Sequence, residues 1–294
     1  MSRVKLTCLV DNSVRTRSKL WGEHGLAFLI ETAAGLILWD TGTSGTVLLH
    51  NLATLNVDPA DLAAVVVSHG HQDHTGGLPA LISRVRPSLP LYGHPALFDE
   101  RFSRHQDRLT SVGSPLSPPE LASHGVVLRL SAESQPVAPG VWTSGAIAPR
   151  PEPEGRSAGH VIRGAGEWVP DPYRDDMALV LELPAGLALI CGCCHAGLLN
   201  TVRYVEQAFG NEIVVIAGGT HLAAAGDDQL AHVGQALAAM PSLRGIWLNH
   251  CSGEKTVDRL RRVLGDEKVH HLPAGSVLDL DLPVPAETNS YGGL

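Results

Sequence analysis

The sequence predicts an α/β fold, in which short strands alternate with helices along most of the chain. Brief apolar runs rich in β-branched residues recur, each followed by glycine or polar residues and then a helical stretch; 63–67 and 213–217 are the clearest. Histidines gather directly after several of these runs, as chemical side chains do at strand ends in α/β proteins. Apolar residues make up 44% and charged residues 18% of the 294, so a sizeable core is expected and disorder is not. We expect one domain over residues 1–294.

In the first half, residues 3–10 alternate in hydropathy as a strand does, and two further apolar runs flank a turn at Gly35, as in a hairpin. The β-branched run before His69 is read as a buried strand, and Gly76-Gly77 as the turn into a helix. The expected strands are 3–10, 26–31, 36–39, 63–67, 89–92, 126–130 and 136–143. The expected helices are 44–53 and 78–85.

In the second half, two apolar runs around a Pro-Ala-Gly turn predict a hairpin, and two later strand-to-helix units follow it. The expected strands are 177–183, 187–190, 213–217, 245–248 and, as a closing edge strand, 276–280. Helices are expected up to about 209, at 229–240 and after 253. Two βαβ-like halves would accommodate this order, although no repeat is visible in the sequence.

Several stretches lack such a pattern. Residues 13–23 are polar and basic, and we interpret them as an exposed connection rather than a loop beside a site. Residues 104–124 are rich in serine and proline and are read as a loop. The long run 148–175 is interrupted by many prolines and glycines, which predicts an active-site lid. The tail 283–294 is expected to be loose.

The charge balance and the cysteines limit the partners and the compartment. A net charge of −8 and a pI near 6.0 argue against nucleic-acid binding through a broad basic surface. No apolar stretch approaches the roughly 20 residues that cross a membrane, and the N-terminus lacks the apolar segment of a secretory signal. Five cysteines, three of them crowded into 191–194, favour reduced thiols. We therefore expect a cytoplasmic protein without a membrane or nucleic-acid partner. The charge does not exclude a small, anionic substrate held by a few local arginines, and the oligomeric state is left open.

One segment carries the strongest chemical signal. Ser68-His69-Gly70-His71-Gln72-Asp73-His74 places three histidines and one aspartate within six positions, at the end of a predicted strand. Neutral imidazoles and a carboxylate together suit zinc, iron or manganese. Isolated histidines are usually ordinary surface or core residues, but four possible ligands on one loop predict a metal site.

Three further histidines share one context. His195, His221 and His250 each lie just past an apolar strand and before a helix. Because the carboxyl ends of neighbouring strands meet at one edge of a sheet, these residues are expected to join the His69–His74 loop. For His221 only its position supports this. His94 also ends a strand; it either orients a leaving group or sits in a turn.

The His-x-His-x-Asp-His segment resembles the hallmark of the metallo-β-lactamase fold. Other stretches in the same order resemble the branch named for 7,8-dihydropterin-6-methyl-4-(β-D-ribofuranosyl)aminobenzene 5′-phosphate synthase. They are 23–31, 38–42, 192–200, 218–222 and 250–255. The resemblance implies an αββα sandwich with a metal site, usually binuclear, at one edge. It also implies that Asp40 braces the metal loop.

By this resemblance, two divalent ions are expected, with zinc first and manganese or iron as alternatives. One would be held by His69, His71 and His195, and the other by Asp73, His74 and His250. The family commonly has a bridging aspartate where this chain has Cys193 after Gly192. Three explanations stay open: a solvent bridge, a Cys193 thiolate ligand, or one weak site. Packed thiols are the simplest interpretation of Cys193 and Cys194.

These ligands predict a hydrolase. Two nearby cations generate a metal-bound hydroxide at neutral pH, which attacks phosphorus or a carbonyl carbon. Asp73 would fix the nucleophile, and His221 or His94 would protonate the leaving group or hold an oxyanion. A small phosphate ester or phosphodiester is the first expectation for the substrate, with a pterin-related compound as one candidate. A lactone or thioester hydrolase is the close alternative, and an iron-dependent oxygen or redox enzyme is the alternative from another class.

Overall fold

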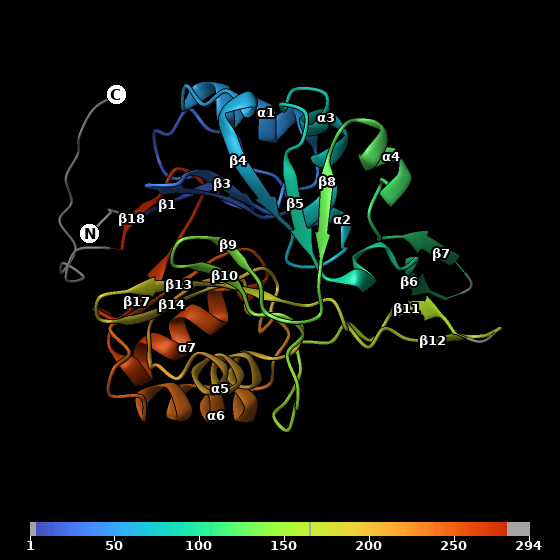
Figure 1. Cartoon of the computed structure of the whole chain (residues 1–294). Coiled ribbons are helices and arrows are strands. Elements are labelled where there is room, and N and C mark those ends of the chain that lie inside the picture. Colours follow the sequence, from blue (N-terminus) through green and yellow to red (C-terminus); the bar gives the residue numbers. More distant parts are fainter. Residues whose placement is uncertain (1–3, 107, 165, 281–294) are drawn as a thin grey trace.

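The computed structural model describes residues 4–106, 108–164 and 166–280. Two seven-stranded sheets lie face to face, and helices cover the outer face of each (Figure 1). The predicted α/β class and the αββα sandwich are therefore confirmed. The expected tail 283–294 falls outside the described residues.

The first sheet has the order β18-β1-β2-β3-β4-β5-β8. Its strands are β18 (Val277–Asp279), β1 (Lys5–Val10), β2 (Ala27–Thr32), β3 (Gly35–Trp39), β4 (Leu62–Val66), β5 (Pro90–Gly93) and β8 (Val127–Leu130). Strands β3, β4, β5 and β8 run parallel, so the chain leaves them at one edge. On the outer face lie α1 (Gly45–Thr54), α3 (Leu78–Ile82) and α4 (Pro118–Ser123), which contribute Leu48, Leu81 and Leu121 to its core.

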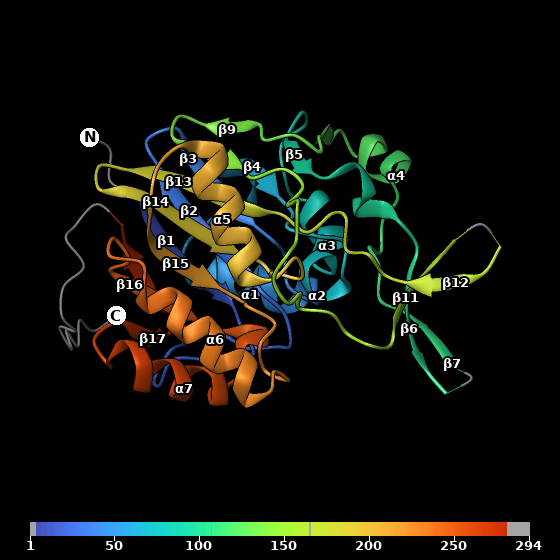
Figure 2. The same ribbon diagram turned by 90° about the horizontal axis from the view of Figure 1, so that it is seen from below.

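The second sheet has the order β17-β16-β15-β14-β13-β10-β9. Its strands are β17 (Val269–His271), β16 (Gly245–Leu248), β15 (Ile213–Gly218), β14 (Gly186–Cys191), β13 (Ala178–Leu183), β10 (Val141–Thr143) and β9 (Pro136–Ala138). Strands β14 to β17 run parallel. Helices α5 (Leu198–Phe209), α6 (Asp227–Ala238) and α7 (Glu254–Leu264) cover its outer face (Figure 2).

Alternating side chains divide the core into three layers. Along β3, Ile37 and Trp39 face the second sheet, whereas Leu38 faces the helices of the first. The second sheet does the same, with Leu189 towards its helices and Ile190 towards the first sheet. Each such fully buried aliphatic side chain contributes about 1.5–3 kcal/mol. This burial fixes the register of the strands, and with it the position of every residue at the strand ends.

A third, four-stranded sheet of order β12-β11-β6-β7 projects from one side of the sandwich (Figures 1 and 2). Its strands are β6 (Arg101–His105), β7 (Arg108–Ser111), β11 (His160–Arg163) and β12 (Trp168–Pro170). The expectation that 104–124 is a loop and 148–175 irregular is thus wrong in part. Strands β6 and β11 pair across more than fifty residues, which local sequence patterns do not reveal.

The buried Arg101 ties this projecting sheet to the rest of the molecule. Its guanidinium forms ion pairs with Asp171, at 2.9 Å, and with Asp175. The other oxygen of Asp175 accepts a hydrogen bond from the backbone of Gly70, at 2.7 Å. Asp175 thus links the sheet directly to the loop after β4, since it contacts both Arg101 and Gly70. All three charged side chains of this network are almost fully buried.

Three smaller differences from the expected elements remain. The single strand expected at 136–143 is the hairpin of β9 and β10, which turns at Gly140 with a φ of 73°. Strand β17 and the short helix α2 (Gln72–Thr75) were not expected. In the described part of the chain, no helix is long and apolar enough to span a bilayer.

Candidate metal centre

Residues from both sheets converge where parallel strands end. The loop after β4 carries His69 to His74, and Asp40 follows β3. From the second sheet, Cys193 and His195 follow β14, His221 follows β15 and His250 follows β16. Among the described residues, Asp73, His74, Cys193 and His250 form one group of possible ligands, and His69, Cys193 and His195 form another, which His71 adjoins. The predicted convergence of histidines at this edge of the sandwich is therefore seen in the structure.

The first group gathers three imidazoles. His71 Nδ1 lies 3.0 Å from His69 Nε2 and 3.2 Å from His195 Nε2. Two ligands at 2.0–2.1 Å from a tetrahedral ion are about 3.3–3.4 Å apart, so these separations suit a shared cation. All three rings are almost completely buried. His69 and His195 also lie within reach of Cys193 Sγ.

The second group centres on Asp73. Its Oδ2 lies 3.3 Å from His250 Nε2 and 3.9 Å from His74 Nε2. His74 Nε2 is in turn 3.1 Å from Cys193 Sγ. The ligating atoms of Asp73, His74, Cys193 and His250 all lie within 4.8 Å of one another. This group thus offers nitrogen, oxygen and sulfur donors, a set typical of zinc or iron sites.

Four of these histidines are oriented in the same way by a hydrogen bond to an oxygen outside the cluster. In each, Nδ1 faces an oxygen and Nε2 faces the cluster. The pairs are His69 with Ser68 Oγ at 2.9 Å, His74 with Asp40 Oδ2 at 2.7 Å, His195 with the Gly155 carbonyl at 2.6 Å, and His250 with Asn12 Oδ1 at 3.0 Å. Carbonyl and carboxylate oxygens accept, and the Ser68 hydroxyl donates to Asp40 and therefore accepts from His69. In all four rings Nδ1 thus carries a proton, and Nε2 of a neutral ring is left with its lone pair. Metal-binding histidines are usually oriented in this way.

Most of the candidate ligands already have the protonation state in which they can bind a metal ion. Burial lowers the pKa of His69, His71 and His195 well below their usual values, so these rings are neutral. Burial would raise the pKa of Asp73, but His74 and hydrogen bonds from neighbouring imidazoles outweigh it and hold the pKa well below the usual range. Ligands of this kind need lose few protons when a cation binds.

His74 behaves differently in the metal-free protein. Burial acts to lower its pKa, but the carboxylates of Asp40 and Asp73 prevail and raise it to about 9. The ring therefore carries a positive charge that balances the buried carboxylates. Burial also raises the pKa of the Cys193 thiol well above its usual value. A bound cation would replace both protons, which makes metal binding pH-dependent.

The backbone is strained at this edge. Asp40, Cys194, His221 and His250 have φ values of 57°, 60°, 50° and 51°, a region that side-chain-bearing residues seldom adopt. Each follows a strand of the parallel core. Such conformations persist where the surroundings enforce them, and they cluster at functional sites. Here they turn the chain sharply enough to aim neighbouring side chains at one point.

His221 lies beside the cluster, whereas His94 is not joined to it. The ring of His221 is 4.4 Å from that of His195, and its Nε2 is 3.1 Å from Ser157 Oγ. His94 Nδ1 instead accepts a hydrogen bond from the backbone of Ala96, at 3.0 Å, and caps the short helix that follows. Among the contacts in the described ranges, none links His94 to the other histidines, which favours its interpretation as a turn residue.

Sequence reasoning missed several neighbours of the cluster. His24 Nε2 lies 3.3 Å from Asp73 Oδ2, and this side chain is 72% exposed. Tyr173 stacks on His195, with ring centroids 4.1 Å apart. Asn12 and Ser68 could have been suspected, because one ends the first strand and the other precedes His69. The carbonyl of Gly155 has no signature in sequence, since any residue carries that group.

The clustered cysteines have different surroundings. Cys191 and Cys194 belong to the apolar core beneath the second sheet, and Cys194 Sγ contacts Thr201 Oγ1 at 3.3 Å. Cys193 is equally buried but belongs to none of the three apolar clusters of the described residues. The interpretation as a packed thiol therefore fits Cys194, whereas the sulfur of Cys193, although buried, lies 3.1 Å from His74 Nε2.

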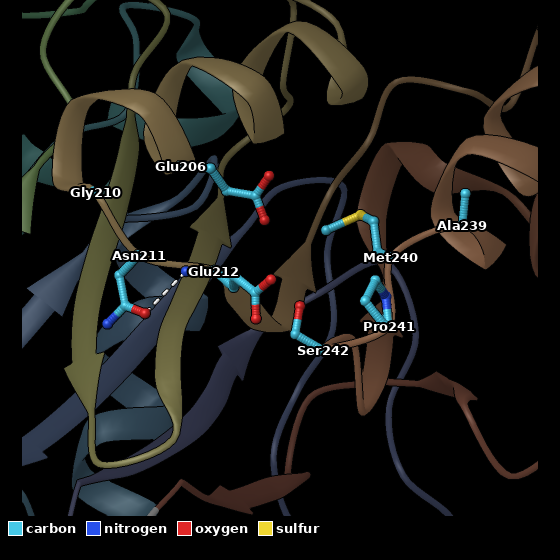
Figure 3. A pocket seen from close by; sticks show the side chains of 8 residues that line it. All are labelled: Glu206, Gly210, Asn211, Glu212, Ala239, Met240, Pro241 and Ser242. Carbon is cyan, nitrogen blue, oxygen red and sulfur yellow. Dashed lines mark hydrogen bonds between the residues drawn. The ribbon is translucent and has the colours of Figure 1, made fainter.

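A shallow hollow of about 380 Å³ lies elsewhere, between the end of α5 and the loop after α6 (Figure 3). Glu206, Glu212 and Met240 contribute to its lining. Glu212 precedes β15, whereas His221 follows it, so the hollow lies at the opposite edge of the sheet from the histidines. It is not part of the candidate metal centre.

Comparison with known proteins agrees with this architecture. The profile of the Metallo-beta-lactamase superfamily matches residues 20–194. The chain is 26% identical, over 95% of its length and 97% of the relative's, to 7,8-dihydropterin-6-methyl-4-(beta-D-ribofuranosyl)-aminobenzene-5′-phosphate synthase of Methanocaldococcus jannaschii. This is the branch that the sequence motifs resemble.

Solved structures share the fold. Tm1679, a metal-dependent hydrolase of the beta-lactamase superfamily, superposes with a TM-score of 0.80 at 24% identity, covering 95% of this chain and 99% of that one. A diphosphatase from the PhnP family superposes with a TM-score of 0.54 at 12% identity, covering 96% and 100%. These structures show the shared fold, and the profile match over more than half of its length shows that the chain belongs to the metallo-β-lactamase superfamily.

Proposed function

We propose that this protein is a metal-dependent hydrolase that uses two divalent cations, with zinc as the first candidate. One observation carries the proposal: ligand side chains from both sheets converge, and four of their imidazoles present Nε2 to the cluster because an outer oxygen holds Nδ1. A merely structural cluster would not require this common orientation.

The chain's residues divide into two sets of ligands. His69, His71 and His195 would hold one ion, and Asp73, His74 and His250 the other. When bound, such a pair of ions supplies an acidified water at neutral pH and positive charge for the anion that develops during hydrolysis. The remaining steps depend on the protein's own side chains.

His221 and His24 flank the cluster on two sides. Ser157 fixes the Nε2 atom of His221 at 3.1 Å, and the ring lies against His195, where it would donate a proton to a leaving group. His24 contacts Asp73 from the exposed side and would meet the substrate first. Tyr173 covers His195 with its ring and excludes water from that side of the cluster.

The substrate that we propose is a small phosphate ester or phosphodiester. The name of the Methanocaldococcus jannaschii relative contains a ribofuranosyl 5′-phosphate and a dihydropterin, which supports an anionic, pterin-related compound. That relative is named a synthase, so hydrolysis rests here on the ligand chemistry. The arginines of the 148–175 segment give less support than their number suggests. Arg150 is bound to Glu154 and to the carbonyls of Pro172 and Tyr173.

Turnover assays on zinc-loaded protein test the proposal. Bis-p-nitrophenyl phosphate should be hydrolysed, and His71→Ala should reduce the rate by at least two orders of magnitude, because the variant lacks one metal ligand. His105→Ala, an exposed histidine on β6, should leave the rate unchanged. Turnover of a lactone or thioester panel without phosphodiester turnover would replace the substrate class. Oxygen consumption by iron-loaded protein without any hydrolysis would replace the reaction.

A further inference from the structure

The described residues place one sulfur atom between the two groups of ligands. Cys193 Sγ belongs to the group of Asp73, His74 and His250 and also to the group of His69 and His195. No other side chain of the described residues belongs to both. A donor atom that two cation positions share occupies the position of a bridging ligand.

The backbone holds Cys193 in this place. Strand β14 ends at Cys191, and the next residue passes so close to Ser68 that a Cβ at Gly192 would lie 2.2 Å from its Oγ. Gly192 also accepts a hydrogen bond from the backbone of Gly219, at 3.1 Å. The left-handed turn at Cys194 then returns His195 to the same cluster. The position of the sulfur is therefore fixed by the main chain on both sides.

The surroundings of Cys193 are those of a ligand rather than of a core thiol. Its Sγ lies 3.1 Å from His74 Nε2, and it takes no part in the apolar clusters that contain Cys191 and Cys194. The sulfur of Cys251 accepts a hydrogen bond from the backbone of His221, at 3.2 Å, and interacts with the side chain of Cys193, but it belongs to neither group of ligands. Among the clustered thiols, Cys193 is thus the one that the fold presents to the histidines.

We propose that Cys193 binds both metal ions through one bridging thiolate. This proposal rests on the proposed two-metal function and assigns to it a ligand that the six histidine and aspartate residues do not provide. On binding, the thiol loses its proton to solvent, and its sulfur forms one bond to each ion. The anionic ligands then number two, Asp73 and Cys193. Because thiolate is a soft donor, the site prefers zinc or iron to manganese or magnesium.

Cobalt substitution tests the bridge directly. The protein is stripped of metal and titrated with Co²⁺, and near-ultraviolet absorption is recorded for thiolate-to-cobalt charge transfer. The wild type should bind two ions per chain and show this absorption. Cys193→Ser should lose it and bind one of the two ions about tenfold more weakly or worse. Cys194→Ser should keep both properties, because its sulfur belongs to neither group and contacts Thr201 Oγ1 instead.

Cys193→Asp provides a second variant that retains an anionic donor. It should bind two ions without the charge-transfer absorption, and its preference for zinc over manganese, measured by elemental analysis after competition, should fall. Two bound ions without the absorption in the wild type, or an absorption that persists in Cys193→Ser, would overturn the thiolate bridge and leave the two-metal site standing. A wild type that binds no ion would overturn both proposals.

Discussion

The carboxylate of Asp40 is the best place to test how the protein orients its metal ligands. It accepts hydrogen bonds from the backbone of Ser68 at 2.7 Å, from the Ser68 hydroxyl at 2.8 Å and from His74 Nδ1 at 2.7 Å. Asp40 and His74 are completely buried. Asp40→Ala therefore leaves donors without partners in a place that water does not reach.

The expected cost follows from the number of stranded donors. Three donors lose their acceptor: the Ser68 amide, the Ser68 hydroxyl and His74 Nδ1. His69 Nδ1, 2.9 Å from the hydroxyl, already carries a proton and cannot accept in its place. A buried unsatisfied group costs about 1–3 kcal/mol, so Asp40→Ala should lower the free energy of unfolding by about 3–9 kcal/mol. Because a domain has only about 5–15 kcal/mol of stability, this loss is large. Metal affinity should also fall about 10–100-fold, since His74 is no longer oriented.

Two further variants separate the contributions. Asp40→Asn keeps an acceptor and tolerates the left-handed backbone at φ 57°, so it should lose about half as much stability. Ser68→Ala removes only the hydroxyl and should cost the least. Urea denaturation of metal-free protein measures stability, and zinc titration against a chromophoric chelator measures affinity. If Asp40→Ala left both unchanged, the orienting role of Asp40 would be refuted.

Two other predictions concern the residues around the metal loop. Burial raises the pKa of Asp175 to about 6 from 3.8, despite the Arg101 guanidinium, so its contribution to stability is complete below pH 3.8 and is lost as the pH rises through about 6. Asp175→Asn does not ionise, so the difference in free energy of unfolding between this variant and the wild type should change by about 3 kcal/mol in favour of the variant between pH 4 and 7. Urea denaturation of metal-free protein measures both free energies, and an equal pH dependence in the two proteins would contradict the prediction. Gly192→Ala places a methyl group 2.2 Å from Ser68 Oγ and should cost about 1–3 kcal/mol by thermal denaturation, whereas Gly226→Ala, with open space around it, should cost far less. Equal losses in the two variants would show that the close approach at residue 192 can relax.

The sequence predicted those parts of the fold in which local pattern and tertiary environment agree. The apolar runs before His69 and before His221 are buried strands, and they carry their histidines to one edge. Strands β6 and β11 escaped prediction because neither has a strong period of its own. Their partners lie more than fifty residues apart, and pairing over that distance leaves no local trace.

The same limit applies to the candidate site. The His69–His74 loop was evident because its four donors are close in sequence. The outer partners were not, because Asn12 lies at the far end of the chain from His250, and Gly155 acts through its main chain alone. His94 satisfied the same positional criterion as His221, yet its ring caps a helix. Position at a strand end therefore narrows the candidates without distinguishing a ligand from a cap.

The carbonyl of Gly155 imposes a restriction on how molecules reach the ions. It lies in the segment 148–175, and it holds the Nδ1 proton of His195 at 2.6 Å. Swinging this segment aside, as a gate would, breaks that bond and frees a ligand to rotate. The side chain of His24, beside Asp73, is open to solvent, so we expect molecules to reach the cluster from that side.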